Sequence, residues 1–131
     1  MFKGSNVALI TPFKDNKLDE ESYIKIINHH LENGTNGLVP VGTTGESPTL
    51  SHDEHERTIE LCIKEATGKL PIIAGTGSNS TEEAVSLTKH AEKAGADGAL
   101  VVTPYYNKPT QEGLYQHYKS INDNCGIPII I

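Results

Sequence analysis

Five short aliphatic runs recur about every thirty residues along the chain, and a polar segment separates each run from the next. The polar segments have the period of a helix; in the first of them Tyr23, Ile27 and Leu31 fall on one face. Runs that are apolar on both faces and alternate with helices are typical of parallel strands in repeated βα units. The sequence therefore predicts an α/β fold with strands within 6–11, 37–41, 70–75, 98–103 and 127–131.

Units that lie two apart resemble each other. The junction at 32–39 shares an acid, a Gly-x-x-Gly pattern and an aliphatic run with the junction at 92–100. The first glycine of each junction, Gly34 or Gly95, suits the left-handed position that ends a helix. Alternation of this kind favours a (β/α)8 TIM barrel, in which alternate strands fill the interior layers. An open doubly wound sheet remains the alternative.

The length of the chain limits how much of a barrel it can form. At about thirty residues per unit, 131 residues provide four βα units and a fifth strand, whereas a closed barrel has about 250 residues. The sequence also stops within an apolar Pro-Ile-Ile-Ile run. We expect residues 1–131 to be the N-terminal portion of a single (β/α)8 barrel domain, with no internal domain boundary.

Composition narrows the class of partner and the compartment. The net charge is −6 and the basic residues are scattered, which argues against nucleic acid as a partner. No segment has the length and hydrophobicity to cross a membrane, and the N-terminus lacks a signal-peptide pattern. Cys62 and Cys125 are expected to be free thiols that act as small apolar residues. Together these features predict a cytoplasmic protein without a membrane partner.

Hydroxyl side chains follow the first four predicted strands, where each strand ends. In the second loop Thr43 and Thr44 stand between Gly42 and Gly45. Glycine allows a tight turn, and unpaired N–H groups at a helix start attract anions. The sequence therefore predicts a polar pocket for a small carboxylate, built from the loops at 11–13, 42–47, 75–79 and 103–107. In the last loop, Tyr105 and Tyr106 should point to different places, one to this pocket and one to a partner surface.

Two further patterns allow other kinds of site. Residues 75–80 approach a dinucleotide-binding fingerprint, but a serine replaces its third glycine. His52 and His55 share a helix face and could bind zinc, but no third ligand has a suitable spacing, so no metal is expected. Ser51 and Glu54 form a capping-box pattern, which makes the first turn of a solvated helix the simpler interpretation. A polar ligand or a subunit contact at the histidines remains open.

Four stretches are distinctive enough to compare with known families: Val-Gly-Thr-Thr-Gly-Glu-Ser (41–47), Leu-Ser-His-Asp-Glu-His (50–55), Ile-Ile-Ala-Gly-Thr-Gly-Ser-Asn (72–79) and Val-Thr-Pro-Tyr-Tyr-Asn-Lys-Pro-Thr-Gln-Glu-Gly-Leu-Tyr-Gln-His-Tyr (102–118). Together they resemble the dihydrodipicolinate synthase family over the whole chain, which would correspond to roughly the first half of such a protein. The resemblance implies a class I aldolase on a (β/α)8 barrel, related to N-acetylneuraminate lyase. Such an enzyme condenses pyruvate, held as a lysine Schiff base, with aspartate semialdehyde in lysine biosynthesis, and needs no cofactor.

The same resemblance implies roles for individual residues. Thr43 matches the threonine of a hydroxyl proton relay, and Thr44 matches a residue that binds the pyruvate carboxylate. Tyr106 matches a relay tyrosine that is contributed across a dimer interface. Feedback lysine would bind at that interface, to residues matching Ser47, His52, His55, Asn79, Glu83 and Tyr105.

The resemblance also implies an assembly and a missing nucleophile. The family assembles as a dimer of dimers, so a homo-oligomer is expected. Its Schiff-base lysine would lie beyond Ile131, and the 131-residue chain alone is therefore expected to be inactive. Two alternatives remain: another pyruvate-dependent aldolase acting on sialic acid or a sugar acid, and a noncatalytic half-barrel that binds lysine or serves assembly.

Overall fold

Parallel strands in chain order form the centre of the structure, a computed structural model that describes residues 2–131. Strand β1 pairs with β4, β5 pairs with β6, and β6 pairs with β7, all in parallel. Two contacts join the β1–β4 pair to the strands β5, β6 and β7. One is a parallel bridge between Leu38 and Ile72, and the other is a 2.9 Å hydrogen bond from Gly75 N to Pro40 O. The strands are β1 (Asn6–Ala8), β4 (Gly37–Val39), β5 (Ile73–Gly75), β6 (Gly98–Leu100) and β7 (Ile129–Ile130).

The order of these strands separates the two predicted architectures. A doubly wound sheet reverses its strand order at a switch point, whereas a barrel adds each strand beside the previous one. The order here is β1-β4-β5-β6-β7, without a reversal among residues 2–131. The predicted α/β partial barrel therefore describes this chain, and the open doubly wound sheet is wrong.

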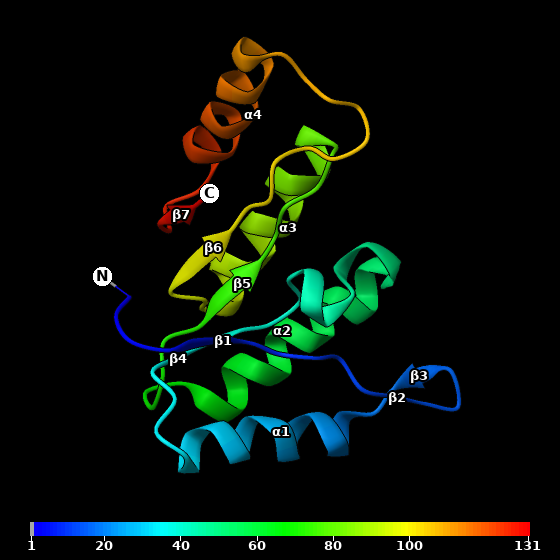
Figure 1. Ribbon diagram of the computed structural model, residues 1–131, viewed down its shortest axis with the longest axis vertical. Coiled ribbons are helices and arrows are strands. Elements are labelled where there is room, and N and C mark those ends of the chain that lie inside the picture. Colours follow the sequence, from blue (N-terminus) through cyan, green and yellow to red (C-terminus); the bar gives the residue numbers. More distant parts are fainter. Residues whose placement is uncertain (1) are drawn as a thin grey trace.

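Four longer helices cover the strands and follow one another along the molecule, from α1 to α4 (Figure 1). Each packs against the next in sequence. The prediction that helices end at Gly34 and Gly95 is confirmed, since both residues have positive φ values. The predicted capping box of Ser51 and Glu54 is also present. The helices are α1 (Glu20–Glu32), α2 (His52–Ala66), α3 (Thr81–Ala94) and α4 (Gln111–Asn124).

The structure departs from the sequence-based prediction in two places. The strands are shorter than the aliphatic runs, partly because Val41, at the end of the second run, has a φ of 47° and so leaves the extended conformation. A small hairpin, β2 (Phe13–Lys14) and β3 (Lys17–Leu18), was not predicted. Its turn residues Asp15 and Asn16 have φ values of 50° and 58°, as a two-residue hairpin loop requires, and this dipeptide was the available signal.

The core lies between the helices and the sheet. Tyr23 and Ile27 of α1 and Ile59 of α2 are fully buried in its larger cluster, together with Leu38. Cys62 is in the same cluster, and burial raises the pKa of its thiol to about 12, so it behaves as the small apolar residue that was expected. A smaller cluster of Ala84, Ala99, Val101 and Ile121 joins α3 and α4 to β6.

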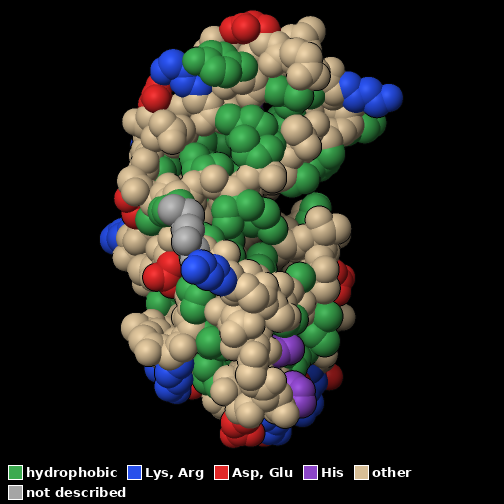
Figure 2. Space-filling model, turned by 60° about the vertical axis from the view of Figure 1, so that its left-hand side comes forward, with side chains coloured by type: hydrophobic (Ala, Val, Ile, Leu, Met, Phe, Trp, Pro, Cys, Tyr) green, Lys and Arg blue, Asp and Glu red, His purple; other side chains and the backbone are tan. Residues whose placement is uncertain are grey.

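Some apolar side chains stay at the surface. Ile10, Val102 and Ile131 are 55%, 46% and 77% exposed. Figure 2 shows hydrophobic side chains reaching the surface through the middle and upper part of one face. Extended apolar surface of this kind is typical of contact surfaces. Within residues 2–131, none of the helices combines the length and hydrophobicity needed to cross a membrane.

Candidate functional site

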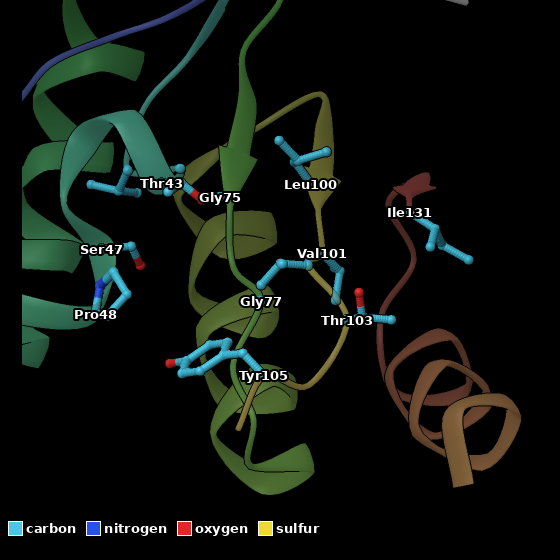
Figure 3. A pocket seen from close by; sticks show the side chains of 13 residues that line it. Thr43, Ser47, Pro48, Gly75, Gly77, Leu100, Val101, Thr103, Tyr105 and Ile131 are labelled. Atoms are coloured by element: carbon cyan, nitrogen blue, oxygen red, sulfur yellow. The ribbon is translucent and has the colours of Figure 1, made fainter. Parts of the chain in front are cut away.

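A pocket of about 530 Å³ lies where the loops after β4, β5 and β6 meet. Its wall is largely apolar, with Val41, Leu100 and Val102 among the side chains that form it. Hydroxyl groups of Thr43, Ser47, Thr103 and Tyr105 complete the lining (Figure 3). An apolar cavity with a few converging polar groups is the usual form of a small-molecule site. Of the four loops expected to build this pocket, those at 42–47 and 103–107 bring hydroxyl groups to it, the loop at 75–79 contributes only Gly75 and Gly77, and the loop at 11–13 does not line it.

The turn that carries Thr43 and Thr44 is held by backbone and side-chain bonds. Residues Thr43–Gly45 form a short 3₁₀ turn, in which Gly45 N donates to Gly42 O at 3.0 Å. The buried hydroxyl of Thr11 donates to Gly45 O at 2.7 Å, so the loop after β1 fixes this turn in place. Thr43 lines the pocket, whereas Thr44 is exposed and is not among the lining residues. The structure thus brings one of the two predicted substrate-binding threonines to the cavity.

Backbone strain lies on both sides of this turn. Val41 and Glu46 have φ values of 47° and 62°, in the left-handed region that side chains disfavour. Such conformations cost about 1–3 kcal/mol each and concentrate at functional sites. Together with the pocket, this strain makes the 41–46 segment a candidate for ligand binding.

The glycines of the next loop serve close packing between neighbouring strand ends. A side-chain carbon at Gly75 would lie 2.3 Å from Val41 O, and one at Gly77 would lie 2.4 Å from Val102 N. Neither position leaves room for a side chain. Strand packing therefore accounts for the Gly-Thr-Gly pattern that resembles a dinucleotide fingerprint.

A charged cluster joins the start of α2 to the start of α3. Glu83 Oε1 lies 2.7 Å from His52 Nε2, and Glu83 Oε2 accepts a hydrogen bond from the buried Ser78 hydroxyl. These hydrogen bonds, Ser78 first and His52 second, lower the pKa of Glu83 below its usual range. Glu83 therefore offers a fixed negative charge at neutral pH. The contact of Ser78 with Glu83 was not predicted, although the place of Ser78 five residues before Glu83, across the helix start, was a usable signal.

His55 has a different environment from His52. Its side chain is buried, with 3% of the residue exposed, and neither ring nitrogen has a hydrogen-bond partner within residues 2–131. Burial lowers the pKa of His55 to about 4, so the ring is neutral at physiological pH. Among these same residues, no three His, Cys, Asp or Glu side chains are placed to hold a metal ion together.

The two adjacent tyrosines point to different places. Tyr105 lines the pocket, and in Figure 3 its ring extends toward the side where Ser47 and Pro48 lie. Tyr106 is 92% exposed and has a φ of 68°. Asn107 follows, and its side-chain amide donates to Asn79 O at 3.1 Å. The divergence expected for the tyrosines is present, and Tyr106 lies outside the pocket of this chain.

The six residues assigned to a lysine site are thus partly assembled. Ser47 and Tyr105 share the pocket, and His52 pairs with Glu83. His55 is buried, and the carbonyl group of Asn79 accepts a hydrogen bond from the tyrosine loop. Among the described residues, no hydrogen bond joins the Ser47–Tyr105 pair to the His52–Glu83 pair. The sequence did not indicate Asn107, because its partner Asn79 is distant in the chain.

The buried His55 predicts a pH-dependent stability. In the unfolded chain His55 gains a proton as the pH falls through 6.5, whereas in the folded chain it does so only near pH 4. The folded state therefore loses stability from about pH 6.5 downward, by about 3 kcal/mol at most. Urea denaturation from pH 7.5 to 4.5 should give a shallower loss for His55→Gln than for the native chain. Equal losses in both would contradict the buried, neutral ring.

Comparison with known proteins places the sequence in one family. A sequence profile described as "Dihydrodipicolinate synthetase family" matches residues 1–131. The 4-hydroxy-tetrahydrodipicolinate synthase of Pelagibacter ubique is 79% identical over 131 residues, which are 100% of this chain and 45% of that protein. The chain therefore spans about 45% of the length of this curated relative.

Solved structures of the same family superpose closely on the fold. Dihydrodipicolinate synthase from Aquifex aeolicus is 58% identical with a TM-score of 0.98, covering 99% of this chain and 44% of that one. The Acinetobacter baumannii enzyme, complexed with pyruvate, is 55% identical with a TM-score of 0.96, covering 98% and 45%. The Cyanidioschyzon merolae enzyme, with lysine bound, is 40% identical with a TM-score of 0.92, also covering 98% and 45%.

Profile, sequence identity and superposition agree over nearly the whole chain. The strand order, with the pocket at the strand ends, is that of a partial barrel, and the Aquifex aeolicus structure superposes on it over 99% of this chain. The chain belongs to the dihydrodipicolinate synthetase family.

Proposed function

We propose that residues 1–131 are the N-terminal part of a single (β/α)8 barrel with 4-hydroxy-tetrahydrodipicolinate synthase activity. The full-length protein would condense pyruvate, held as a lysine Schiff base, with aspartate semialdehyde in the cytoplasm. The observation that carries this proposal is the apolar pocket at the strand ends with the Thr43 hydroxyl on its wall. The 79% identical Pelagibacter ubique relative and the pyruvate complex of the Acinetobacter baumannii enzyme support it.

Thr43 is the residue of this chain best placed to act on a bound keto acid. Within residues 2–131 no side chain forms a hydrogen bond with its hydroxyl, so the group is available to a ligand and to a proton relay. Thr44, which follows in the same turn, would contact the pyruvate carboxylate through its hydroxyl and backbone N–H. N–H groups at the start of a helical turn favour an anion. Tyr106 would complete the relay in a neighbouring subunit, which its exposure permits.

The imine-forming lysine would come from outside this chain. None of the ten lysines lines the pocket. Lys108 follows shortly after Tyr105, which lines the pocket, but Lys108 is exposed. A nucleophilic lysine needs a desolvated site, in which it can be uncharged. The exposed apolar side chains Val102 and Ile131 line the same pocket, and the rest of the barrel would cover them. A homo-oligomer, formed as a dimer of dimers, is part of the same proposal.

Feedback lysine is the regulatory ligand that the Glu83 cluster suits. An amino acid with a cationic side chain needs a carboxylate for its ammonium group, and Ser78 and His52 hold Glu83 charged. Ser47 and Tyr105 would add polar contacts from the pocket side, with His52, His55 and Asn79 around the helix starts. The lysine-bound Cyanidioschyzon merolae enzyme supports this assignment.

Trapping with pyruvate and borohydride tests the proposed function. We expect the full-length protein to form a covalent adduct on a lysine outside residues 1–131, and the 131-residue chain to form none, because it lacks a desolvated lysine. Intact mass and peptide mapping locate the adduct. Comparable trapping on one of the ten lysines of this chain would overturn the assignment, and an inert full-length protein would favour a noncatalytic lysine-binding or assembly module.

The relay predicts a loss of turnover without a loss of fold. In the full-length protein, Thr43→Val keeps the side-chain shape but removes the hydroxyl, and kcat should fall about 10-fold or more, as for a group that transfers protons. Thr67→Val, at the end of α2 and distant from the pocket, is the matched control and should leave kcat unchanged. Steady-state kinetics with pyruvate and aspartate semialdehyde make the comparison. An unchanged kcat for Thr43→Val would remove its role.

Regulation by lysine depends on the charge of Glu83. Losing a charge-assisted hydrogen bond costs about 1.5–3 kcal/mol, so Glu83→Gln should weaken lysine inhibition at least 10-fold while pyruvate KM stays nearly the same. The neighbouring exposed acid Glu82, changed to Gln, is the matched control and should leave inhibition unaltered. Inhibition curves and calorimetry measure the effect. Absence of lysine binding to the native full-length protein would refute the regulatory assignment alone.

A further inference from the structure

The loop that presents Tyr106 contains an unusually strained turn. Asn107 N donates to Tyr105 O at 2.9 Å, which closes a three-residue turn around Tyr106. With a φ of 68° at its centre, this is the γ-turn of positive φ, which is rare and strained. Lys108 also has a positive φ, of 41°, so the strain extends beyond the turn. Such a conformation persists only where surrounding contacts hold it.

Among residues 2–131, one side-chain hydrogen bond joins residues 105–107 to another segment. The amide of Asn107 donates to the carbonyl of Asn79 at 3.1 Å. Asn79 precedes Ser80, the N-cap residue of α3, so it lies directly before the start of that helix. Tyr106 itself is almost fully exposed, and among residues 2–131 no hydrogen bond involves its hydroxyl. The position of its ring therefore depends on the backbone turn rather than on contacts of the side chain.

We propose that Asn107 is a positioning residue for Tyr106. Its bond to Asn79 O holds the strained turn, and the turn directs Tyr106 away from the pocket that Tyr105 lines, toward a second subunit. Because Asn79 precedes α3, the same bond also connects the tyrosine loop to the helix that carries Glu83. This inference rests on the proposed function, since it assigns Asn107 a role through the relay tyrosine of that reaction.

The Asn107→Asp variant of the full-length protein tests this role. Aspartate has the shape of asparagine but, when ionised, has no hydrogen to donate to the Asn79 carbonyl. We expect kcat to fall about 3- to 10-fold, the effect of losing one hydrogen bond that holds the competent conformation, while pyruvate KM changes less than 2-fold. Asn33→Asp is the matched control, because Asn33 also donates from an exposed amide to a backbone carbonyl, that of His29, far from this loop. It should leave kcat unchanged.

A double-mutant cycle separates positioning from a general structural effect. If Asn107 acts through Tyr106, then Asn107→Asp should cause less than a 2-fold further loss of kcat in the Tyr106→Phe background. Two results would overturn the inference. One is a loss of kcat in the double variant equal to the product of the two single losses, and the other is a kcat of Asn107→Asp equal to the native value. Should Asn107→Asp not fold, as judged by thermal unfolding, Asn107→Ala gives the same comparison. A native full-length protein without synthase activity would instead count against the proposed function.

Discussion

The hydrogen bonds between β4 and β5 hold the two parts of the sheet together, and the site depends on that junction. Leu38 N donates to Pro71 O at 3.0 Å, and Gly75 N donates to Pro40 O at 2.9 Å. The backbones come so close at Gly75 that no side chain fits there. The pocket spans this junction, with Val41 and Thr43 on one side and Leu100 and Val101 on the other. Without the close approach, the loops that carry the hydroxyl groups would not border one cavity.

Hydrogen bonding keeps Glu83 charged, whereas burial keeps the nearby His55 uncharged. Glu83 accepts hydrogen bonds from Ser78 and His52, which favours its ionised form. His55, one turn after His52, is removed from water and is held neutral. The cluster therefore presents one stable negative charge beside an uncharged ring. A ligand with a positive charge is the natural complement of such a surface.

Backbone strain coincides with the segments assigned to function. Val41 and Glu46 enclose the threonine turn, and Tyr106 occupies the centre of a strained γ-turn. In each case a specific contact opposes relaxation: the Thr11 hydroxyl bonds Gly45 O, and the Asn107 amide bonds Asn79 O. Both contacts join loops that follow different strands. The loops at this edge of the sheet are thus fixed by one another as much as by the strands.

Local structure could be predicted from the sequence alone. Helical periodicity around Tyr23 and Ile27, the capping box at Ser51 and the glycine at 95 all depend on residues within a few positions of each other, and the structure has them as predicted. Alternation of strands and helices indicated an α/β fold, and the resemblance of units two apart favoured a barrel, but the strand order was needed to exclude an open doubly wound sheet. Other features depended on tertiary packing: Thr43 but not Thr44 lines the pocket, and His55 is buried. Ser78 bonds Glu83, and Asn107 bonds Asn79. These features arise from packing between segments that are distant in the chain. The local sequence pattern does not fix them, because the same pattern is compatible with different burial and different hydrogen bonds.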